Sequence, residues 1–379
     1  LLAILTTLIL SVAIVRVMNL ELIGVDDANI LFVYSKHLAT GEGLVYNIGG
    51  EHVEGFSSML WMLVAAFGYL LSNQPSILLF ALNVLLVGSA MAYAWQTIDS
   101  RLPAAHNGGA RDDNQIASLS GLVFLGWMAA NPSYFIWTVT SLMETGLWAA
   151  LLLSTVVLCL RMIIDDDTGP WRLVGFTILN MSLLLTRPEG MAWVLYFLAV
   201  LLLVFRWQGK SFSSLARDWL IVAAACGICI TTLILFRLYY FGYPLPNTYY
   251  AKMTPDKLYD LRFGLIYFVQ FMAMNWLAII LILAAVGVAG RYLPASIGTL
   301  IQGEKRLDRY QLGRFFMASA ALVGILLPIL MGGDIFGAFR FFQPVWPLLI
   351  LTVLLLPVPK LIRQTRALSI AGVIVICVA

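Results

Sequence analysis

The chain has 379 residues, of which 61% are hydrophobic and 11% charged, and its formal net charge is only +3. Such a composition cannot cover a water-facing surface, so it excludes a soluble globular protein and predicts an all-α polytopic membrane protein. The small net charge and the scattered lysines and arginines also exclude a nucleic-acid-binding surface.

Twelve apolar runs are candidate membrane spans, since about 20 apolar residues suffice to cross a bilayer. They lie at 1–19, 57–73, 76–97, 116–131, 143–162, 172–186, 190–206, 218–240, 263–289, 314–331, 342–359 and 367–379. Loops rich in Lys and Arg stay in the cytoplasm. By this rule the inner loops are 205–217, 290–314 and 359–366. Counting the spans back from these loops places 98–115 and 163–171 on the inner side as well. The outer loops are then 132–142, Arg187–Gly190, 241–262 and 332–341.

The count of spans requires one run that does not cross. If 20–56 is external like 241–262, an even number of spans separates them, yet seven runs lie between. We select 57–73, because it is short and precedes the turn-like sequence Ser72-Asn73-Gln74-Pro75. The prediction is a bundle of about eleven transmembrane helices with an inner N-terminus and an outer C-terminus.

The first outer segment carries two adjacent carboxylates, Asp26 and Asp27. Such a pair suits one group to accept a proton while the other orients it or a partner, although it could equally begin the following helix. Residues 29–38 are predicted to form a short amphipathic helix on the membrane surface, with Ile30, Val33, Tyr34 and His37 at helical spacing.

Three further outer segments combine polar residues with turns. Thr186–Gly190 contains Arg187 and Glu189, which form either part of a site or an interfacial ion pair. The segment Pro244–Lys252 mixes prolines, tyrosines and Lys252, and Gly332–Phe342 places Arg340 among glycines and aromatic residues. A guanidinium held at the edge of an apolar run suits a phosphate group, because its planar fork matches phosphate oxygens. The alternative role for Arg340 is simple anchoring.

These motifs resemble a known family when they are taken together and in order. They are DDANILFVYSKHLATGEGLVYNIGGEHVEGFSS (Asp26 to Ser58), TRPEG, PNTYYAK (Pro246 to Lys252) and GGDIFGAFRFFQPVWP (Gly332 to Pro347). The chain resembles the GT-C membrane glycosyltransferases, in particular the AftB-type arabinofuranosyltransferases. It departs from many relatives at Phe56-Ser57-Ser58-Met59, and its 379 residues do not include the C-terminal outer domain of the mycobacterial type.

The resemblance implies one GT-C-type domain over 1–379 whose active site lies in the outer loops 20–75, 241–262 and 332–341. It implies a polyprenyl-phosphate-sugar donor, no nucleotide-sugar, and transfer of D-arabinofuranose to a glycan or pilin-type protein at the bacterial inner membrane. Asp26 and Asp27 would be the acid/base pair, and Arg340, Arg187 and Lys252 would hold donor phosphate. The candidate pocket residues are Tyr34, His37, Glu54, Glu144, Glu189, Asn247, Tyr249, Tyr250 and Asp334.

Several alternatives remain open at this point. An aspartate acts either as a base in an inverting transfer or as a nucleophile in a retaining one. No cofactor is required, although Asp334 and Glu144 could join the aspartate pair around a divalent ion. The rival functions are a transporter or flippase of lipid-linked sugar precursors, which inverted repeats would favour, and a non-catalytic assembly subunit.

Overall fold

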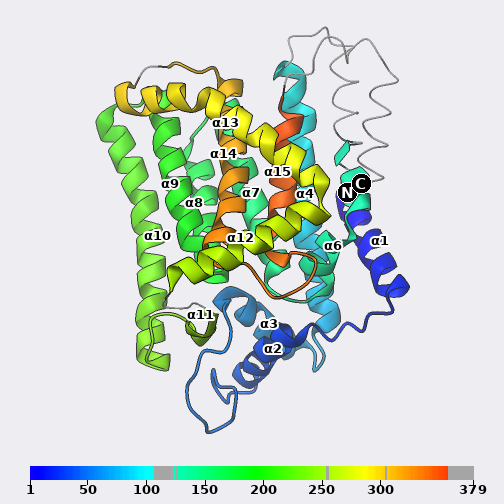
Figure 1. Ribbon diagram of the computed structural model, residues 1–379. Helices are drawn as coiled ribbons and strands as arrows, with labels where there is room; N and C mark the ends of the chain where they lie inside the picture. The colour runs from blue at the N-terminus through cyan, green and yellow to red at the C-terminus, as the bar shows by residue number, and fades with distance from the viewer. Residues whose placement is uncertain (106–120, 122, 125, 253–255, 304, 357–379) are drawn as a thin grey trace.

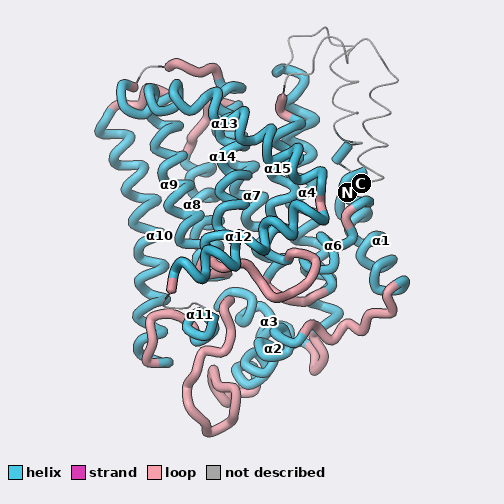
Figure 2. Tube along the Cα trace, viewed as in Figure 1, coloured by secondary structure: helices cyan, strands magenta, loops and turns pink. Residues whose placement is uncertain are grey.

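The computed structural model describes the chain except for residues 106–120, 122, 125, 253–255, 304 and 357–379 (Figure 1). Its described part is helical and contains no strand (Figure 2). Within this described part, six helices are long and apolar enough to cross a membrane. They are α4 (Ser76–Ala105), α7 (Thr145–Ile164), α9 (Gly190–Trp207), α10 (Phe212–Phe241), α13 (Trp276–Gln302) and α14 (Arg309–Leu330). The expectation of an α-helical membrane protein is confirmed at this level.

The other helices are shorter or more polar. They are α1 (Leu2–Val17), α2 (Asp26–Ala39), α3 (Met59–Leu71), α6 (Pro132–Phe135), the π-helix η1 (Ile136–Thr140), α8 (Pro170–Thr186), α11 (Asn247–Lys252), α12 (Lys257–Met274), the 3-10 helix η2 (Arg340–Val345) and α15 (Trp346–Leu354). The predicted runs 116–131 and 342–359 lie partly outside the described residues, and 367–379 lies wholly outside them. Eleven spans are therefore not found among the described residues.

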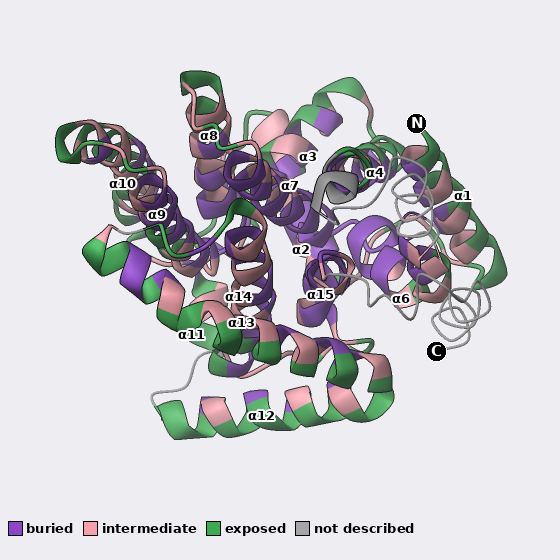
Figure 3. Ribbon diagram, turned by 90° about the horizontal axis from the view of Figure 1, so that it is seen from above, coloured by how far each residue is buried: buried purple, intermediate pink, exposed green. Residues whose placement is uncertain are grey.

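The predicted run 263–289 is divided into two helices. Asn275 has φ −131° and ψ 71°, so the backbone leaves the helical conformation there, and its side-chain amide donates to the Phe271 carbonyl. α12 begins with charged residues and runs across the bundle at its periphery, whereas α7 is seen end-on in the same view (Figure 3). α13 continues to Gln302, into the segment 290–314 that was predicted to be a loop.

α7 forms the centre of the bundle. Nearly all of its side chains are buried, and it packs against α4, α8 and α14. Figure 3 shows the buried residues gathered around this helix, while α10 and α12 lie at the edge with largely exposed surfaces. Because lipid solvates apolar side chains, such exposed faces are ordinary for a membrane protein.

The loops gather at the two ends of the bundle. One end, here called the site end, holds α2, α3, α11 and the segments 131–144, 187–189 and 332–345 (Figure 1). The opposite end joins 163–171, 205–217 and 300–309, where Trp207 Nε1 donates to the Leu307 carbonyl and Arg309 to the Ile164 carbonyl. α3 has 13 residues and lies beside α2, and α4 starts at that same end. A helix of this length is too short to cross a bilayer.

Candidate functional site

α2 presents the two aspartates at its amino-terminal turn. Asp26 is exposed and Asp27 is partly buried, and both carboxylates lie where the helix dipole favours negative charge. The Val25 N–H donates to the Ser141 carbonyl at 3.2 Å, which ties the start of α2 to the segment before α7. The amphipathic helix predicted at 29–38 is present, but its buried face differs from the expected one. Its buried residues are Ala28, Leu31, Phe32, Tyr34 and Ser35.

Arg340 is a deeply buried charge at the site end, with 2% of its surface exposed. Its Nε donates to Asp334 Oδ2 at 2.7 Å and its Nη1 donates to Met143 Sδ at 3.1 Å. The Nη1 atom also lies 3.9 Å from Asp27 Oδ2, which is beyond hydrogen-bond distance. Arg340 thus joins α2, the segment before α7 and the loop 332–339.

Three aromatic rings enclose the Arg340 guanidinium. Its central carbon lies 4.5 Å from the ring centre of Phe336, 5.0 Å from that of Phe341 and 5.5 Å from that of Trp137. Aromatic faces attract a cation, and more strongly where water is excluded. The rings therefore stabilise a charge that would be unfavourable in an apolar surrounding without partners.

The backbone of the loop before Arg340 is strained. Gly332 and Gly333 have positive φ angles, and so do Ala338 and Phe339, which carry side chains. Such conformations concentrate at functional sites, where surrounding contacts enforce them. Here Trp137 Nε1 donates to the Gly337 carbonyl at 3.0 Å and Gln343 Nε2 to the Ala338 carbonyl at 2.6 Å.

Arg187 lies in the turn between α8 and α9 and meets two carboxylates. Its Nη2 donates to Glu189 Oε1 at 2.8 Å, and its Nη1 donates to Glu144 Oε1 at 3.3 Å. Burial alone would lower the pKa of Arg187, but the charges of Glu189 and Glu144 raise it, so the guanidinium stays charged. Burial would likewise raise the pKa of Glu189, and the adjacent Arg187 lowers it below its ordinary value.

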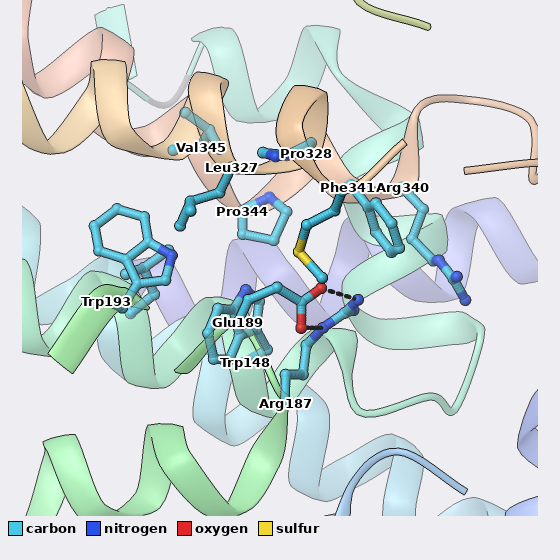
Figure 4. A pocket seen from close by; sticks show the side chains of 13 residues that line it. Trp148, Arg187, Glu189, Trp193, Leu327, Pro328, Arg340, Phe341, Pro344 and Val345 are labelled. Atoms are coloured by element: carbon cyan, nitrogen blue, oxygen red, sulfur yellow. Dashed lines mark hydrogen bonds and ion pairs between the residues drawn. The ribbon is translucent and has the colours of Figure 1, made fainter. Parts of the chain in front are cut away.

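A small cavity lies between the two arginines and α14. It is lined by aromatic and apolar side chains of α7, α9, α14 and η2, and by Arg187, Glu189 and Arg340. Figure 4 shows the Arg187–Glu189 pair on one side of Phe341 and the Arg340 guanidinium directed away from that pair. The cavity volume is about 30 Å³, which is room for one or two waters. A sugar ring would need the surrounding side chains to move.

The charges of this cluster do not balance. The guanidinium groups of Arg187 and Arg340 face four carboxylates, those of Asp27, Asp334, Glu144 and Glu189. Each arginine therefore already has carboxylate partners, and a phosphate would compete with them. Among the described residues, no group of three or more His, Cys, Asp or Glu side chains is arranged to hold a metal ion.

Comparison with known proteins identifies no relative: no family model, curated protein or solved structure matches the chain. Any function of this site therefore rests on its geometry and chemistry.

The remaining candidates of the first outer loop have partners other than Arg340, and one of them, Glu54, is held against α10. Glu54 is buried and accepts from Arg237 Nε at 2.8 Å and from Arg237 Nη2 at 2.9 Å. Burial raises the pKa of Glu54, and the Arg237 contacts act in the opposite direction. His37 bonds through Nδ1 to the Val45 carbonyl at 2.9 Å, so its ring stabilises the turn after α2.

The candidates of the 241–262 loop form a separate group at the site end. The backbone N–H of Asn247 donates to the Glu54 carbonyl at 3.0 Å, which links α11 to the first outer loop. Tyr249 and Tyr250 pack edge to face, and Tyr250 is largely exposed. Lys252 is the last residue of α11, and its side chain lies outside what the structure describes.

Sequence reasoning missed the contribution of 131–143. Trp137 and Met143 contact Arg340 directly, and Leu142 adopts a positive φ of 57° while its carbonyl accepts from Trp61 Nε1. These residues are apolar and stand in an apolar surrounding, so a search for charges does not find them. The available signal was Asn131-Pro132, which is typical of a helix start outside a span.

Proposed function

We propose that this chain is a membrane glycosyltransferase that moves a sugar from a polyprenyl-phosphate donor to a hydroxyl of an extracytoplasmic acceptor. The observation that carries the proposal is the 3.9 Å approach of Asp27 Oδ2 to Arg340 Nη1. Such a transfer needs a base for the acceptor hydroxyl and a cation for the departing phosphate. Here the Asp27 carboxylate lies next to the buried Arg340 guanidinium.

The two carboxylates at Arg340 differ in how closely each contacts its guanidinium. Asp334 makes a hydrogen bond of 2.7 Å, whereas the contact of Asp27 is longer than a hydrogen bond. A donor phosphate therefore displaces Asp27 from Arg340 before it displaces Asp334. This exchange directs Asp27 to the acceptor hydroxyl while phosphate charge replaces its own.

In the proposed reaction the bond between the sugar C1 and the phosphate oxygen breaks, and its electron pair leaves on that oxygen. The acceptor oxygen forms the new bond to C1, and its proton passes to Asp27. If Asp27 attacks C1 itself, a covalent intermediate forms and the configuration at C1 is retained. The anomeric configuration of the product distinguishes these two courses.

The motifs of the outer loops suggest D-arabinofuranose as the sugar through their resemblance to the AftB-type enzymes. The same resemblance suggests a bacterial inner membrane with the site end outward, and a cell-wall glycan, lipid-linked glycan or pilin-type protein as acceptor. Arg187 has a supporting part, because Glu189 and Glu144 already engage its guanidinium. The role of Lys252 in phosphate binding stays a prediction.

The test is transfer from synthetic polyprenyl-phosphoryl arabinofuranose to a panel of acceptors in nanodiscs. Asp27→Asn is expected to lower turnover about 10²- to 10⁴-fold, the usual contribution of a general base. Asp26→Asn is measured beside it, because Asp26 is the exposed member of the predicted acid/base pair on the same helical turn, and we expect the larger loss in Asp27→Asn. Arg340→Ala is expected to weaken donor binding as well as turnover.

Two results would contradict the proposal. Full activity of Asp27→Asn would show that another residue is the catalytic base. Donor binding by the wild type without transfer to any acceptor would favour a transporter or flippase of lipid-linked sugars. Turnover that is lost in EDTA and restored by Mg²⁺ or Ca²⁺ would show that a metal is required.

A further inference from the structure

A short strap of residues, 52–56, joins α2 to the end of α10. On the α10 side, Glu54 is bonded to Arg237, and the two side chains are 1% and 6% exposed. The His52 ring stacks on Tyr240 with ring centres 4.3 Å apart, and Phe56 packs edge to face with Phe241. The strap is thus fixed to α10 by one buried ion pair and two ring contacts.

On the other side, Tyr34 of α2 binds the strap on both flanks of Glu54. Its hydroxyl donates to the Val53 carbonyl at 2.6 Å and accepts from the Gly55 N–H at 3.1 Å. A Cβ at position 55 would lie 2.9 Å from this hydroxyl, so the close approach requires glycine. Burial raises the pKa of Tyr34, which keeps the hydroxyl protonated and able to donate.

The spacing along α2 connects this contact to the aspartate. Tyr34 follows Asp27 by seven residues, which is close to two helical turns, so both side chains lie on the same side of α2. A helix turn is stiff, and a displacement at Tyr34 therefore moves Asp27 with it. A displacement of about 1 Å at a reacting group can lower a rate about 100-fold.

We propose that the Glu54–Arg237 pair and Tyr34 position α2 so that Asp27 lies at Arg340. They are positioning residues, because they act on Asp27 through the helix. An arginine inside the apolar helix α10 is unfavourable without a partner, so Arg237 draws Glu54, and with it the strap, to a fixed depth. The kinetic part of this inference rests on the proposed glycosyl transfer, whereas its effect on the position of α2 does not.

The test compares Tyr34→Phe and Glu54→Gln with the wild type in nanodiscs. Both variants keep the size of the side chain, and Tyr46→Phe is the matched control, since Tyr46 lies next to Tyr34 and is 45% exposed. We expect kcat to fall about 10- to 100-fold, with the KM for the donor changed less than about twofold because Arg340 is untouched. The double variant Glu54→Arg with Arg237→Glu is expected to recover part of the loss in kcat, since the ion pair is restored.

Backbone hydrogen exchange gives a readout that does not depend on activity. If the strap positions α2, amide exchange becomes faster both in 44–56 and in Asn29–Val33 in the two variants. Faster exchange confined to 44–56, or an unchanged kcat in both variants, would overturn the inference. If the wild type transfers no sugar, the proposed function fails, and the exchange of Asn29–Val33 still decides whether the strap positions α2.

Discussion

Removal of the Asp334 charge tests whether burial determines how much the Asp334–Arg340 ion pair contributes to the free energy of unfolding. Asp334→Asn keeps the shape of the side chain but leaves a guanidinium that is 2% exposed with its nearest carboxylate contact removed. Breaking one side of a buried ion pair destabilises a protein by about 3–5 kcal/mol. Because three aromatic rings and Asp27 remain at Arg340, we expect the lower value, about 3 kcal/mol.

The matched control is Asp165→Asn at the opposite end of the bundle. Asp165 lies 2.7 Å from Arg172 Nη2, the same distance as in the Asp334 pair, but these side chains are 15% and 25% exposed. Water can replace a partner there, so we expect a loss below about 1 kcal/mol. Arg172 also keeps a second carboxylate, Asp167 Oδ2 at 3.1 Å from its Nε, so the two variants differ both in burial and in the partner that remains.

The assay is reversible unfolding in mixed micelles of increasing SDS content, followed by tryptophan fluorescence. The shift of the transition midpoint relative to the wild type gives the change in the free energy of unfolding at constant slope. Equal losses in the two variants would refute the argument that burial determines the strength of the pair. A loss in Asp334→Asn below about 1 kcal/mol would show that the aromatic rings and Asp27 together are enough to stabilise Arg340.

Three further predictions concern a loop glycine, an ionisable pair and the orientation of the chain in the membrane. Gly333→Ala is expected to destabilise the protein in the same assay, because φ at this position is +73° and a new Cβ would lie 2.7 Å from Cβ of Tyr267 in α12. Gly337→Ala is the control, since its new Cβ would meet nothing within 4 Å, and it should be nearly neutral. The pKa of Glu189 is lowered by its arginine partner, so the ionised group stabilises the fold above the ordinary pKa of 4.5 and this contribution is lost as pH falls below it. The thermal midpoint of the wild type should therefore exceed that of Glu189→Gln at about pH 6, and the difference should shrink as the pH falls below the ordinary pKa of 4.5. In a cysteine-free background, Asn73→Cys should react with an impermeant thiol reagent from the outside and Ser213→Cys from the inside, and labelling of both from one side would contradict the proposed topology.

The membrane-embedded helices could be predicted from the sequence because every span must satisfy its own backbone hydrogen bonds and therefore needs a long apolar run. The division of the apolar run 263–289 into two helices could not be predicted in this way. A window that averages hydropathy does not respond to a single residue, yet Asn275 ends one helix and starts the next. The continuation of α13 to Gln302 was missed because charge was used to identify a loop, and charge does not end a helix.

The charged part of the site was open to prediction for a similar reason. An ionisable side chain in an apolar chain is conspicuous and usually has a partner, so Arg340, Arg187 and Asp27 stood out. Their partners were harder to assign. Glu54 and Arg237 are 183 residues apart, and nothing in their local sequences relates them. Pairing across a fold depends on how helices pack, which local patterns do not encode.

The π-helix before α7 makes the arginine site sensitive to chain length. The Ser141 N–H donates to the Ile136 carbonyl at 2.8 Å, five residues back, so this turn contains one residue more than an α-helical turn. A turn widened in this way absorbs its extra residue locally, so the segment after it keeps its direction. The widened turn contains Trp137, whose ring lies over the Arg340 guanidinium. Deletion of Val139 would close it to an ordinary turn, and we expect the change to fall on the contact between Trp137 and Arg340 rather than on Leu142 and Met143 beyond it.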